Sequence, residues 1–232
     1  MSTQDPNLAL KRDAAERAVE AVEDGMVLGL GTGSTATLAI EALGRRVQGG
    51  LDVIGIPTSE ATAALARRLG IKLTDFASHD TIDLTIDGAD AVDRTTLHLI
   101  KGLGGALLRE KIVASASRRM LVMVDESKLA APFGGHCPVP VEITRFGWQS
   151  TERRLAALDG APKLRHGPDG QPLITDGGNF ILDCAFGAIA DAAALEARIK
   201  ALVGVIETGL FINLATEVII AAPGGVSVLH RR

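Results

Sequence analysis

The chain has 232 residues, of which 47% are hydrophobic and 22% charged, values typical of a folded soluble protein rather than a disordered one. Its net charge of -4 argues against a nucleic-acid binder, because such proteins normally present a basic surface. Any anionic ligand must therefore be met by a local cluster of cations.

The sequence also disfavours a disulfide framework, a metal site, an export signal and a membrane span. Cys137 and Cys184 form neither a CxxC pair nor a disulfide framework, so both are expected to be buried small hydrophobes. The five histidines lack metal-site spacing, and we infer no metal. The first residues are too polar for an export signal, and the apolar runs are too short for a membrane span. We therefore expect a cytoplasmic protein with neither a membrane nor a nucleic acid as partner.

The first half of the chain alternates between helical and strand-like periods. Pro6 to Asp24 predicts an amphipathic helix that ends at Gly25, and residues 26–47 then read as strand, glycine turn and helix. The same alternation follows in residues 51–70 and again, with an acidic strand end, in "TIDLTIDGAD". Such alternation predicts an α/β fold, a Rossmann-like and mostly parallel sheet with helices on both faces. Ligands of such sheets collect beyond the carboxyl ends of the strands.

The pattern changes near Pro132, where prolines and glycines precede a new order of elements. Residues 132–207 read as β-α-β-β-α-β, the order of a ferredoxin-like α+β domain. The segment "EVIIAAPGGVSVL" then looks like a strand and turn that return to the first sheet. We therefore predict a catalytic α/β domain of residues 1–131 and 208–232, with the small domain of residues 132–207 inserted into it.

The first glycine turn, "GLGTGSTA", lies between a strand and a helix, where backbone N–H groups and the helix dipole favour an anion. Its spacing fits G-x-G-x-x-A, but the acidic residue that a dinucleotide site needs at the end of the next strand is missing, and no GK[ST] follows. Thr32, Ser34 and Thr35 instead offer hydroxyl and N–H groups to a small phosphate or a sugar oxygen. The alternative is a tight turn with a hydroxyl helix cap.

Acidic and basic residues follow the later strands. Asp87 and Asp90 flank Gly88 at a strand end, although a solvated Asx turn is an alternative there. In "LIKGLGGALLREK" a strand is expected to end at Lys101, and Glu110 falls in the helix that follows; alone, it could be a surface ion-pair partner. Together, one lysine, two aspartates and one glutamate at neighbouring loops of one sheet edge would form an acid/base set.

Two more lysines could hold a phosphate group. Lys128 ends the strand in "VDESK", where the nearby glycine turn favours a phosphate contact over a merely solvated charge. Lys11, early in the first helix, is the weaker candidate.

Four stretches, "GTGST", "DGAD", "KGLGGALLREK" and "VDESK", resemble in order and spacing the type A ribose-5-phosphate isomerases. The resemblance continues through "TDGGNFILD" and "GVIETGLF" and so covers nearly the whole chain. It implies a cofactor-free interconversion of D-ribose 5-phosphate and D-ribulose 5-phosphate through an enediolate, by an enzyme that forms dimers or tetramers.

The resemblance also implies roles for individual residues. Glu110 matches the base that moves a proton between C1 and C2, Asp87 and Asp90 the pair that assists ring opening, and Lys101 a cation beside the developing oxyanion. Leu103 departs from the glycine that some members carry there, which could reshape the loop. The substrate-binding residues implied are Thr32, Gly33, Ser34, Thr35, Gly88, Ala89, Gly102, Leu103, Gly104, Lys128 and Lys11.

Two alternatives belong to other classes. One is a sugar-phosphate-sensing domain of a repressor with this fold, although only about 25 residues precede the first predicted strand, too few for a helix-turn-helix segment beside the first helix. The other is a coenzyme A transferase-like enzyme on a related sheet, which would need a glutamate nucleophile.

Overall fold

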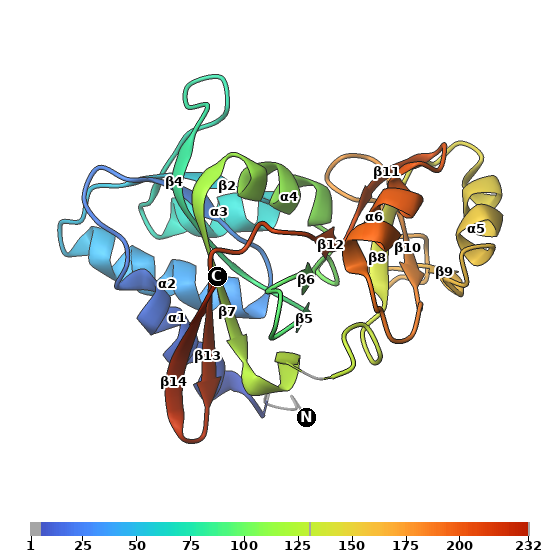
Figure 1. The fold of residues 1–232 in the computed structure, drawn as a ribbon. Coiled ribbons are helices and arrows are strands. Elements are labelled where there is room, and N and C mark those ends of the chain that lie inside the picture. Colours follow the sequence, from blue (N-terminus) through green and yellow to red (C-terminus); the bar gives the residue numbers. More distant parts are fainter. Residues whose placement is uncertain (1–5, 130, 232) are drawn as a thin grey trace. The chain divides into compact units, whose positions relative to one another are not determined.

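The computed structural model describes residues 6–129 and 131–231, which form two compact units (Figure 1). The first unit contains the chain up to Ala89, Ile112–Lys128 and the chain from Leu214 onward. The second contains Asp90–Lys111 and Leu129–Asn213. The second unit is thus built from two insertions into the first.

The first unit is built on a seven-stranded sheet in the order β14-β13-β7-β4-β1-β2-β3. All neighbouring strands pair in parallel except the last two of the chain, which form an antiparallel hairpin. This hairpin is the return to the first sheet that the sequence predicted. The strands are β1 (Val27–Leu30), β2 (Ile54–Pro57), β3 (Lys72–Leu73), β4 (Ile82–Gly88), β7 (Ser117–Asp125), β13 (Glu217–Ala222) and β14 (Gly225–His230).

Helices pack on both faces of this sheet. Leu28 and Leu30 of β1 join residues of α1 and α2 in the main hydrophobic core. Between them Gly29 points to the opposite face, where a Cβ would lie 2.6 Å from Cγ1 of Val113 in α4. The predicted α/β class is therefore confirmed. The helices are α1 (Leu8–Val19), α2 (Ser34–Gln48), α3 (Glu60–Arg68) and the part of α4 (Leu107–Ser115) from Ile112 onward, the first turn of α4 belonging to the second unit.

The first helix is shorter than the sequence predicts, because α1 ends at Val19 rather than near Gly25. The following residues are held by the loop before β2 instead. Gly25 N–H donates to the Asp52 carbonyl at 2.8 Å, and Asp52 N–H donates to the Asp24 carboxylate at 2.8 Å. Tertiary hydrogen bonds thus replace the last helical turn.

The second unit contains a four-stranded antiparallel sheet in the order β11-β8-β10-β9. With one helix after the first strand and one after the third, this is the predicted β-α-β-β-α-β order. Its apolar face is filled by Val141, Leu155, Leu182 and Ile199, all fully buried. The elements are β8 (Val139–Ile143), α5 (Trp148–Ala156), β9 (Pro162–Leu164), β10 (Phe180–Cys184), α6 (Ala192–Lys200) and β11 (Val205–Thr208).

A three-stranded sheet in the order β12-β6-β5 completes the second unit. It consists of β5 (Ala91–Val92), β6 (Leu99–Ile100) and β12 (Leu210–Phe211), all paired antiparallel. Ala91, Ile100 and Leu210 share the hydrophobic cluster of the ferredoxin-like sheet. Residues 90–111 therefore lie in the compact unit of the ferredoxin-like sheet, whereas the domain boundaries proposed from the sequence put them with the larger domain. Those boundaries stay a prediction.

In the part of the chain that the structure describes, no helix is both long and apolar enough to cross a lipid bilayer.

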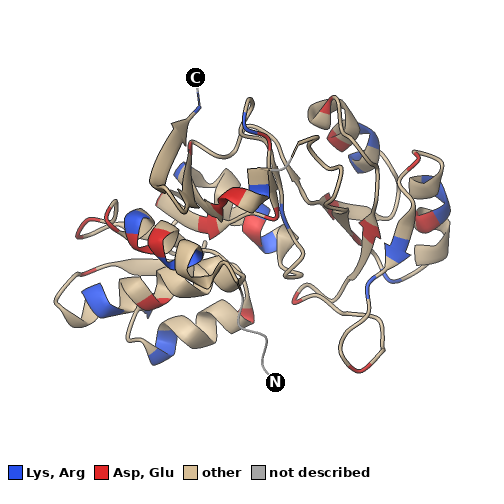
Figure 2. Cartoon of the chain, turned by 90° about the horizontal axis from the view of Figure 1, so that it is seen from below, with Lys and Arg blue, Asp and Glu red and all other residues tan. Residues whose placement is uncertain are grey.

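Basic and acidic residues are interspersed along the helices and loops of each unit (Figure 2). An anion would accordingly be bound by a local arrangement of donors and cations, several of which lie at the ends of strands.

Candidate functional site

The glycine turn between β1 and α2 holds the carboxylate of Asp87. Asp87 is fully buried near the end of β4, beside β1 in the sheet. Its Oδ1 accepts hydrogen bonds from Thr32 N–H at 3.2 Å and Gly88 N–H at 2.7 Å. Gly31 permits this approach, because a Cβ at that position would lie only 2.2 Å from Oδ1. The sequence motifs "GTGST" and "DGAD" therefore meet directly.

The same turn begins a 15-residue helix whose N-terminus is suited to an anion. Gly33 occupies the N-cap position with φ +107°, a conformation that favours glycine, and has no side chain with which to cap the helix. The N–H groups at the start of α2 are therefore left to a ligand or to water. Lys11 of α1 donates a 3.0 Å hydrogen bond to the Ser34 hydroxyl, which brings a positive charge to this helix end.

A cluster of hydroxyl groups that the sequence analysis did not select supports the turn from behind. The Thr32 hydroxyl lies 2.7 Å from that of Thr58, 2.9 Å from that of Ser59 and 3.1 Å from that of Thr62. Thr58 and Thr62 also donate to the carbonyls of Leu30 and Gly31 at 2.9 and 2.8 Å. The hydroxyls at the end of β2 thus order the turn, in the place where a dinucleotide-binding fold would carry an acidic residue.

Lys128 lies in a short 3-10 helix, Glu126–Leu129, directly after β7. The start of that helix is tied down by Asp125, a buried residue at the end of β7. Asp125 Oδ1 accepts hydrogen bonds from Asn7 Nδ2 at 3.2 Å and from Ser127 N–H at 3.1 Å. Lys128 therefore follows an anchored strand end, as the sequence predicted.

In the second unit, Lys101 and Glu110 form a buried ion pair. Lys101 Nζ lies 3.3 Å from Glu110 Oε1, and the two side chains are 3% and 4% exposed. Glu110 lies in the first turn of α4, where a carboxylate is favoured by the helix dipole. Lys101 directly follows β6, so the expectation that it follows a strand of the main sheet is wrong: β6 pairs with β5 and β12 instead. Lys101 N–H donates to the Gly209 carbonyl at 2.9 Å, a contact across more than 100 residues that the local pattern does not indicate.

A second lysine, Lys111, lies near the same aromatic ring as Lys101. Lys101 Nζ lies 5.5 Å and Lys111 Nζ 5.1 Å from the ring centroid of Phe211, a fully buried residue of β12. Both distances suit a cation–π interaction. Lys111 Nζ also pairs with Glu196 at 2.8 Å and with Glu207 at 2.9 Å. The charge next to the predicted base is thus embedded in a network that balances lysines with glutamates.

This network determines how Glu207 titrates. Burial raises the pKa of the Glu207 carboxyl, but hydrogen bonds from Lys200 and Lys111 outweigh burial and hold that pKa below its ordinary value. Cys184 is buried, as the sequence predicted, and this burial, with help from the nearby Asp183 carboxylate, raises the pKa of its thiol to about 12. Cys137 is only half-buried, so the expectation that both cysteines are buried is wrong for Cys137.

Asp90, the third predicted carboxylate, is fixed by the lysine-glycine loop of the same unit. Asp90 N–H donates to the Ile100 carbonyl at 2.8 Å, and its Oδ2 accepts from Leu103 N–H at 2.9 Å. Gly102, with φ +106°, lets the loop turn between Lys101 and Leu103. The structure therefore brings Asp90, Lys101, Leu103 and Glu110 together within the second unit, and Thr32, Asp87 and Ser34 within the first.

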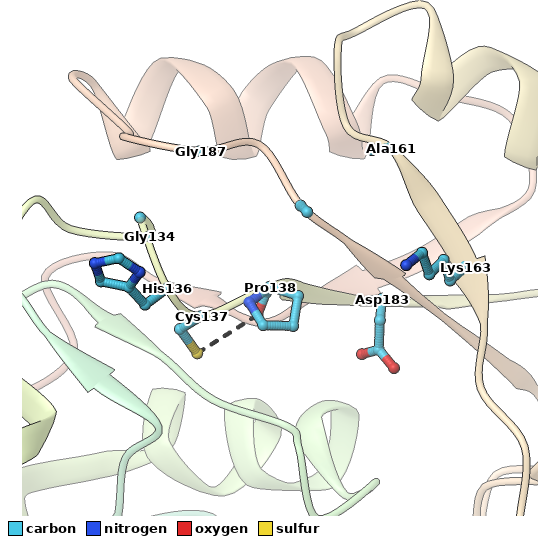
Figure 3. A pocket seen from close by; sticks show the side chains of 10 residues that line it. Gly134, His136, Cys137, Pro138, Ala161, Lys163, Asp183 and Gly187 are labelled. Carbon is cyan, nitrogen blue, oxygen red and sulfur yellow. Dashed lines mark hydrogen bonds between the residues drawn. The ribbon is translucent and has the colours of Figure 1, made fainter.

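A pocket of about 500 Å³ in the second unit lies elsewhere (Figure 3). It is lined by the glycine-rich segment that ends at Pro138 and by residues of β9 and β10, among them Lys163 and Asp183. None of the predicted site residues lines it. Among residues 6–129 and 131–231, no group of three or more His, Cys, Asp or Glu side chains is arranged to hold a metal ion.

Comparison with known proteins places this geometry in a family. Residues 54–225 match the family model of ribose 5-phosphate isomerase A (phosphoriboisomerase A). The chain belongs to the ribose 5-phosphate isomerase A family. The family resemblance stated from the four motifs is therefore confirmed, and three of them, from "DGAD" to "VDESK", lie inside the matched residues.

Relatives of the ribose 5-phosphate isomerase A family match along nearly the whole chain. Ribose-5-phosphate isomerase A of Gloeobacter violaceus is 56% identical over 95% of both chains, and that of Thermomicrobium roseum is 53% identical over 95% of this chain and 93% of its own. The structure of ribose 5-phosphate isomerase A from Methanocaldococcus jannaschii aligns with a TM-score of 0.92 and 42% identity over 97% of this chain and 99% of its own. A D-ribose-5-phosphate isomerase structure in complex with phospho-erythronic acid aligns with a TM-score of 0.93 and 39% identity, over 96% and 98% of the two chains.

Several residues contact members of the predicted set and were missed from the sequence. Lys111 and Phe211 lie inside the quoted motifs "KGLGGALLREK" and "GVIETGLF", so their place beside Lys101 was open to prediction. Thr58 directly follows β2, so its place at a strand end was also open to prediction. Arg165, in contrast, lies outside every motif, and no local signal points to it.

Proposed function

We propose that this chain is an aldose-ketose isomerase that interconverts D-ribose 5-phosphate and D-ribulose 5-phosphate by proton transfer, without a cofactor. The observation that carries this proposal is the buried pair of Lys101 and Glu110 in a chain that belongs to the ribose 5-phosphate isomerase A family. An isomerisation through an enediolate needs a base for a carbon-bound proton and a positive group for the oxygen that becomes negative. A carboxylate and an ammonium group 3.3 Å apart can supply both.

Glu110 acts as the base. Its carboxylate removes the proton from C2 of the open aldose and returns it to C1, while the hydroxyl proton on the C2 oxygen passes to the C1 oxygen. The aldehyde and the neighbouring hydroxyl thereby become a hydroxymethyl group and a ketone. Its side chain is only 4% exposed, which limits exchange of the transferred proton with bulk water. Lys101 stabilises the negative charge on the oxygen of the enediolate, and Phe211 and Glu110 keep its ammonium group in a defined place.

Asp87 and Asp90 handle the protons bound to oxygen. Ring opening transfers a proton from the anomeric hydroxyl to the ring oxygen, and a carboxylate can accept and return it. Both carboxylates are held by backbone N–H groups, Asp87 by Thr32 and Gly88, and Asp90 by Leu103. Backbone donors fix the position of a carboxylate more rigidly than mobile side chains do.

The phosphate group of the substrate binds at the N-terminus of α2. Ser34 and Thr35 supply hydroxyl and N–H groups there, and Lys11 and Lys128 supply positive charge. We assign the binding of the sugar to the remaining residues that the motif resemblance implies, namely Thr32, Gly33, Gly88, Ala89, Gly102, Leu103 and Gly104.

The proposal is tested by incubating the purified protein with D-ribose 5-phosphate in D₂O, without additives. Proton transfer through an enediolate predicts ketose formation with partial deuterium incorporation at C1, because the burial of Glu110 limits but does not abolish exchange of the transferred proton with solvent. Binding without conversion would instead indicate a sugar-phosphate-sensing domain. Conversion that requires a coenzyme A thioester would indicate a transferase, and ketose formation without any deuterium uptake would contradict the proposed base.

The cellular location and the oligomeric state of this enzyme are proposed as well. A cytoplasmic location agrees with a sugar phosphate as substrate, because phosphorylated sugars do not diffuse across membranes. We also propose that the chain forms a homodimer or homotetramer, which light scattering of the purified protein would measure directly.

A further inference from the structure

The lysine-glycine loop is held by a hydrogen bond of its own, from Gly105 N–H to the Gly102 carbonyl at 3.0 Å, and by support from outside the loop. Gly102 and Gly105 have φ values of +106° and +84°, and a Cβ on Gly102 would lie 2.8 Å from Cβ of Leu107. The Leu103 side chain is 45% exposed, so burial of this side chain does little to hold the loop. The orientation of the Leu103 peptide nevertheless matters, because its N–H is the donor to Asp90.

Arg165, directly after β9, provides that support. Its Nη1 donates hydrogen bonds to the carbonyl of Gly102 at 2.8 Å and to that of Leu103 at 3.0 Å. One guanidinium nitrogen thus binds two successive carbonyls of the loop, on both sides of the Leu103 residue whose N–H faces Asp90. The loop can rotate away from Asp90 only by breaking these bonds.

The guanidinium group is itself locked in place by Asp183 of β10. Arg165 Nε donates to Asp183 Oδ2 at 2.9 Å, and Nη2 pairs with Oδ1. The two side chains are 12% and 25% exposed, so solvent screens the pair less than it would at the surface. The backbone of Arg165 is also fixed, because its N–H donates to the Ile181 carbonyl and its carbonyl accepts from Leu173 N–H, both at 2.9 Å.

From this chain of contacts we propose that Arg165 is a positioning residue for the isomerase reaction, which holds Asp90 in its reactive orientation through the Leu103 peptide. Asp183 orients the guanidinium, the guanidinium holds the two loop carbonyls, and the loop presents Leu103 N–H to Asp90. This inference rests on the proposed role of Asp90. An arginine suits this position because its planar guanidinium group carries five N–H donors. A lysine ammonium group cannot bind a carboxylate in a bidentate way and two carbonyls at once.

The experiment compares kcat and KM for D-ribose 5-phosphate in four variants and the wild type. Arg165→Met removes the donors and keeps the aliphatic stem, and Arg165→Lys keeps the charge but not the fork. Asp183→Asn keeps the shape of the orienting residue. A displacement of about 1 Å at a reacting group can cost on the order of 10²-fold, so we expect Arg165→Met to lower kcat by about 10- to 100-fold with a smaller change in KM. Arg154→Met, which removes an exposed guanidinium from α5, is the control and keeps the wild-type kcat.

Arg165→Lys and Asp183→Asn retain part of the support, so we expect both to fall between the wild type and Arg165→Met. They also keep the proposal testable if Arg165→Met fails to fold, which its thermal unfolding curve will reveal. A kcat for all three variants within about twofold of the wild type would overturn the proposal.

The route through Asp90 is tested in the Asp90→Asn background. If Arg165 acts through Asp90, adding Arg165→Met to Asp90→Asn lowers kcat by no more than about a further twofold. Losses that multiply would show that Arg165 acts by another route and would overturn the inference. A near-normal kcat of Asp90→Asn alone would refute the proposed role of Asp90, and that result is distinct from a silent Arg165→Met.

Discussion

Replacing Gly31 by alanine tests whether the close contact between the glycine turn and Asp87 serves catalysis. A Cβ on Gly31 would lie 2.2 Å from Oδ1, 2.3 Å from Cγ and 2.7 Å from Cα of Asp87. Because a methyl carbon and such atoms rarely approach within about 3.0 Å, the carboxylate must retreat by about 0.8 Å. Misplacing a reacting group by that amount can cost on the order of 10²-fold, so we expect kcat to fall to that extent. Crowding at a buried site should also lower the free energy of unfolding by about 1–3 kcal/mol.

The assay measures ketose formation from D-ribose 5-phosphate over a range of substrate concentrations, together with urea unfolding of the same preparation. Gly224→Ala is the matched control, because a Cβ there meets nothing within 4 Å. We expect it to keep the wild-type kcat and to change the free energy of unfolding by no more than about 0.5 kcal/mol. If Gly31→Ala retains kcat within about twofold of wild type, the placement of Asp87 against the turn is unimportant for the reaction and its proposed role is wrong.

Three further predictions concern the side chains of Glu110, Lys128 and Glu207. Glu110→Gln should lower kcat on the order of 10²–10⁴-fold with little change in KM; steady-state kinetics with near-normal kcat would remove Glu110 from the mechanism. Lys128→Ala should mainly raise KM, because a phosphate contact is shared by ground and transition states, and a pure loss of kcat would contradict that assignment. The lowered pKa of Glu207 stabilises the folded state above the ordinary carboxyl value of 4.5, and this contribution is lost as pH falls through the folded pKa. Urea unfolding between pH 6 and about pH 3.5 should therefore show a shallower loss of stability for Glu207→Gln than for wild type, and equal slopes would count against the hydrogen bonds from Lys111 and Lys200.

The class of fold and the order of elements were predictable because each depends on neighbours in the sequence. A strand buried on both faces appears in the sequence as a short apolar run such as "MVLGL", and a helix appears as apolar residues spaced every three or four positions. The alternation of these two patterns predicts the parallel sheet. The same reasoning predicted the β-α-β-β-α-β order of residues 132–207, which the antiparallel sheet confirms. The bounds of α1 were predicted less well, because hydrogen bonds to Asp52 end that helix early.

The motifs predicted which residue types lie at strand ends, but not which strands carry them. Lys101 was expected at the main sheet, and only the pairing of β6 with β12 shows that it belongs to the second unit. That pairing joins residues more than 100 positions apart, Ile100 with Leu210, and the path of the chain between them decides it. The same pairing of β12 with β6 brings the Phe211 ring close to Lys101.

By itself, the sequence determined the alternating elements and the family, and it predicted the anion-binding turn and the acid and base residues. Only the tertiary structure decided what contacts those residues: the hydroxyls of Thr58 and Thr62 beside that of Thr32, the ring of Phe211 near two lysines, and the guanidinium of Arg165 on the loop carbonyls. The physical reason is that periodicity and turn chemistry act over a few residues, whereas a hydrogen bond from Arg165 to Gly102 joins groups 63 positions apart. Such contacts exist only once the chain has folded and leave no periodic trace in the sequence.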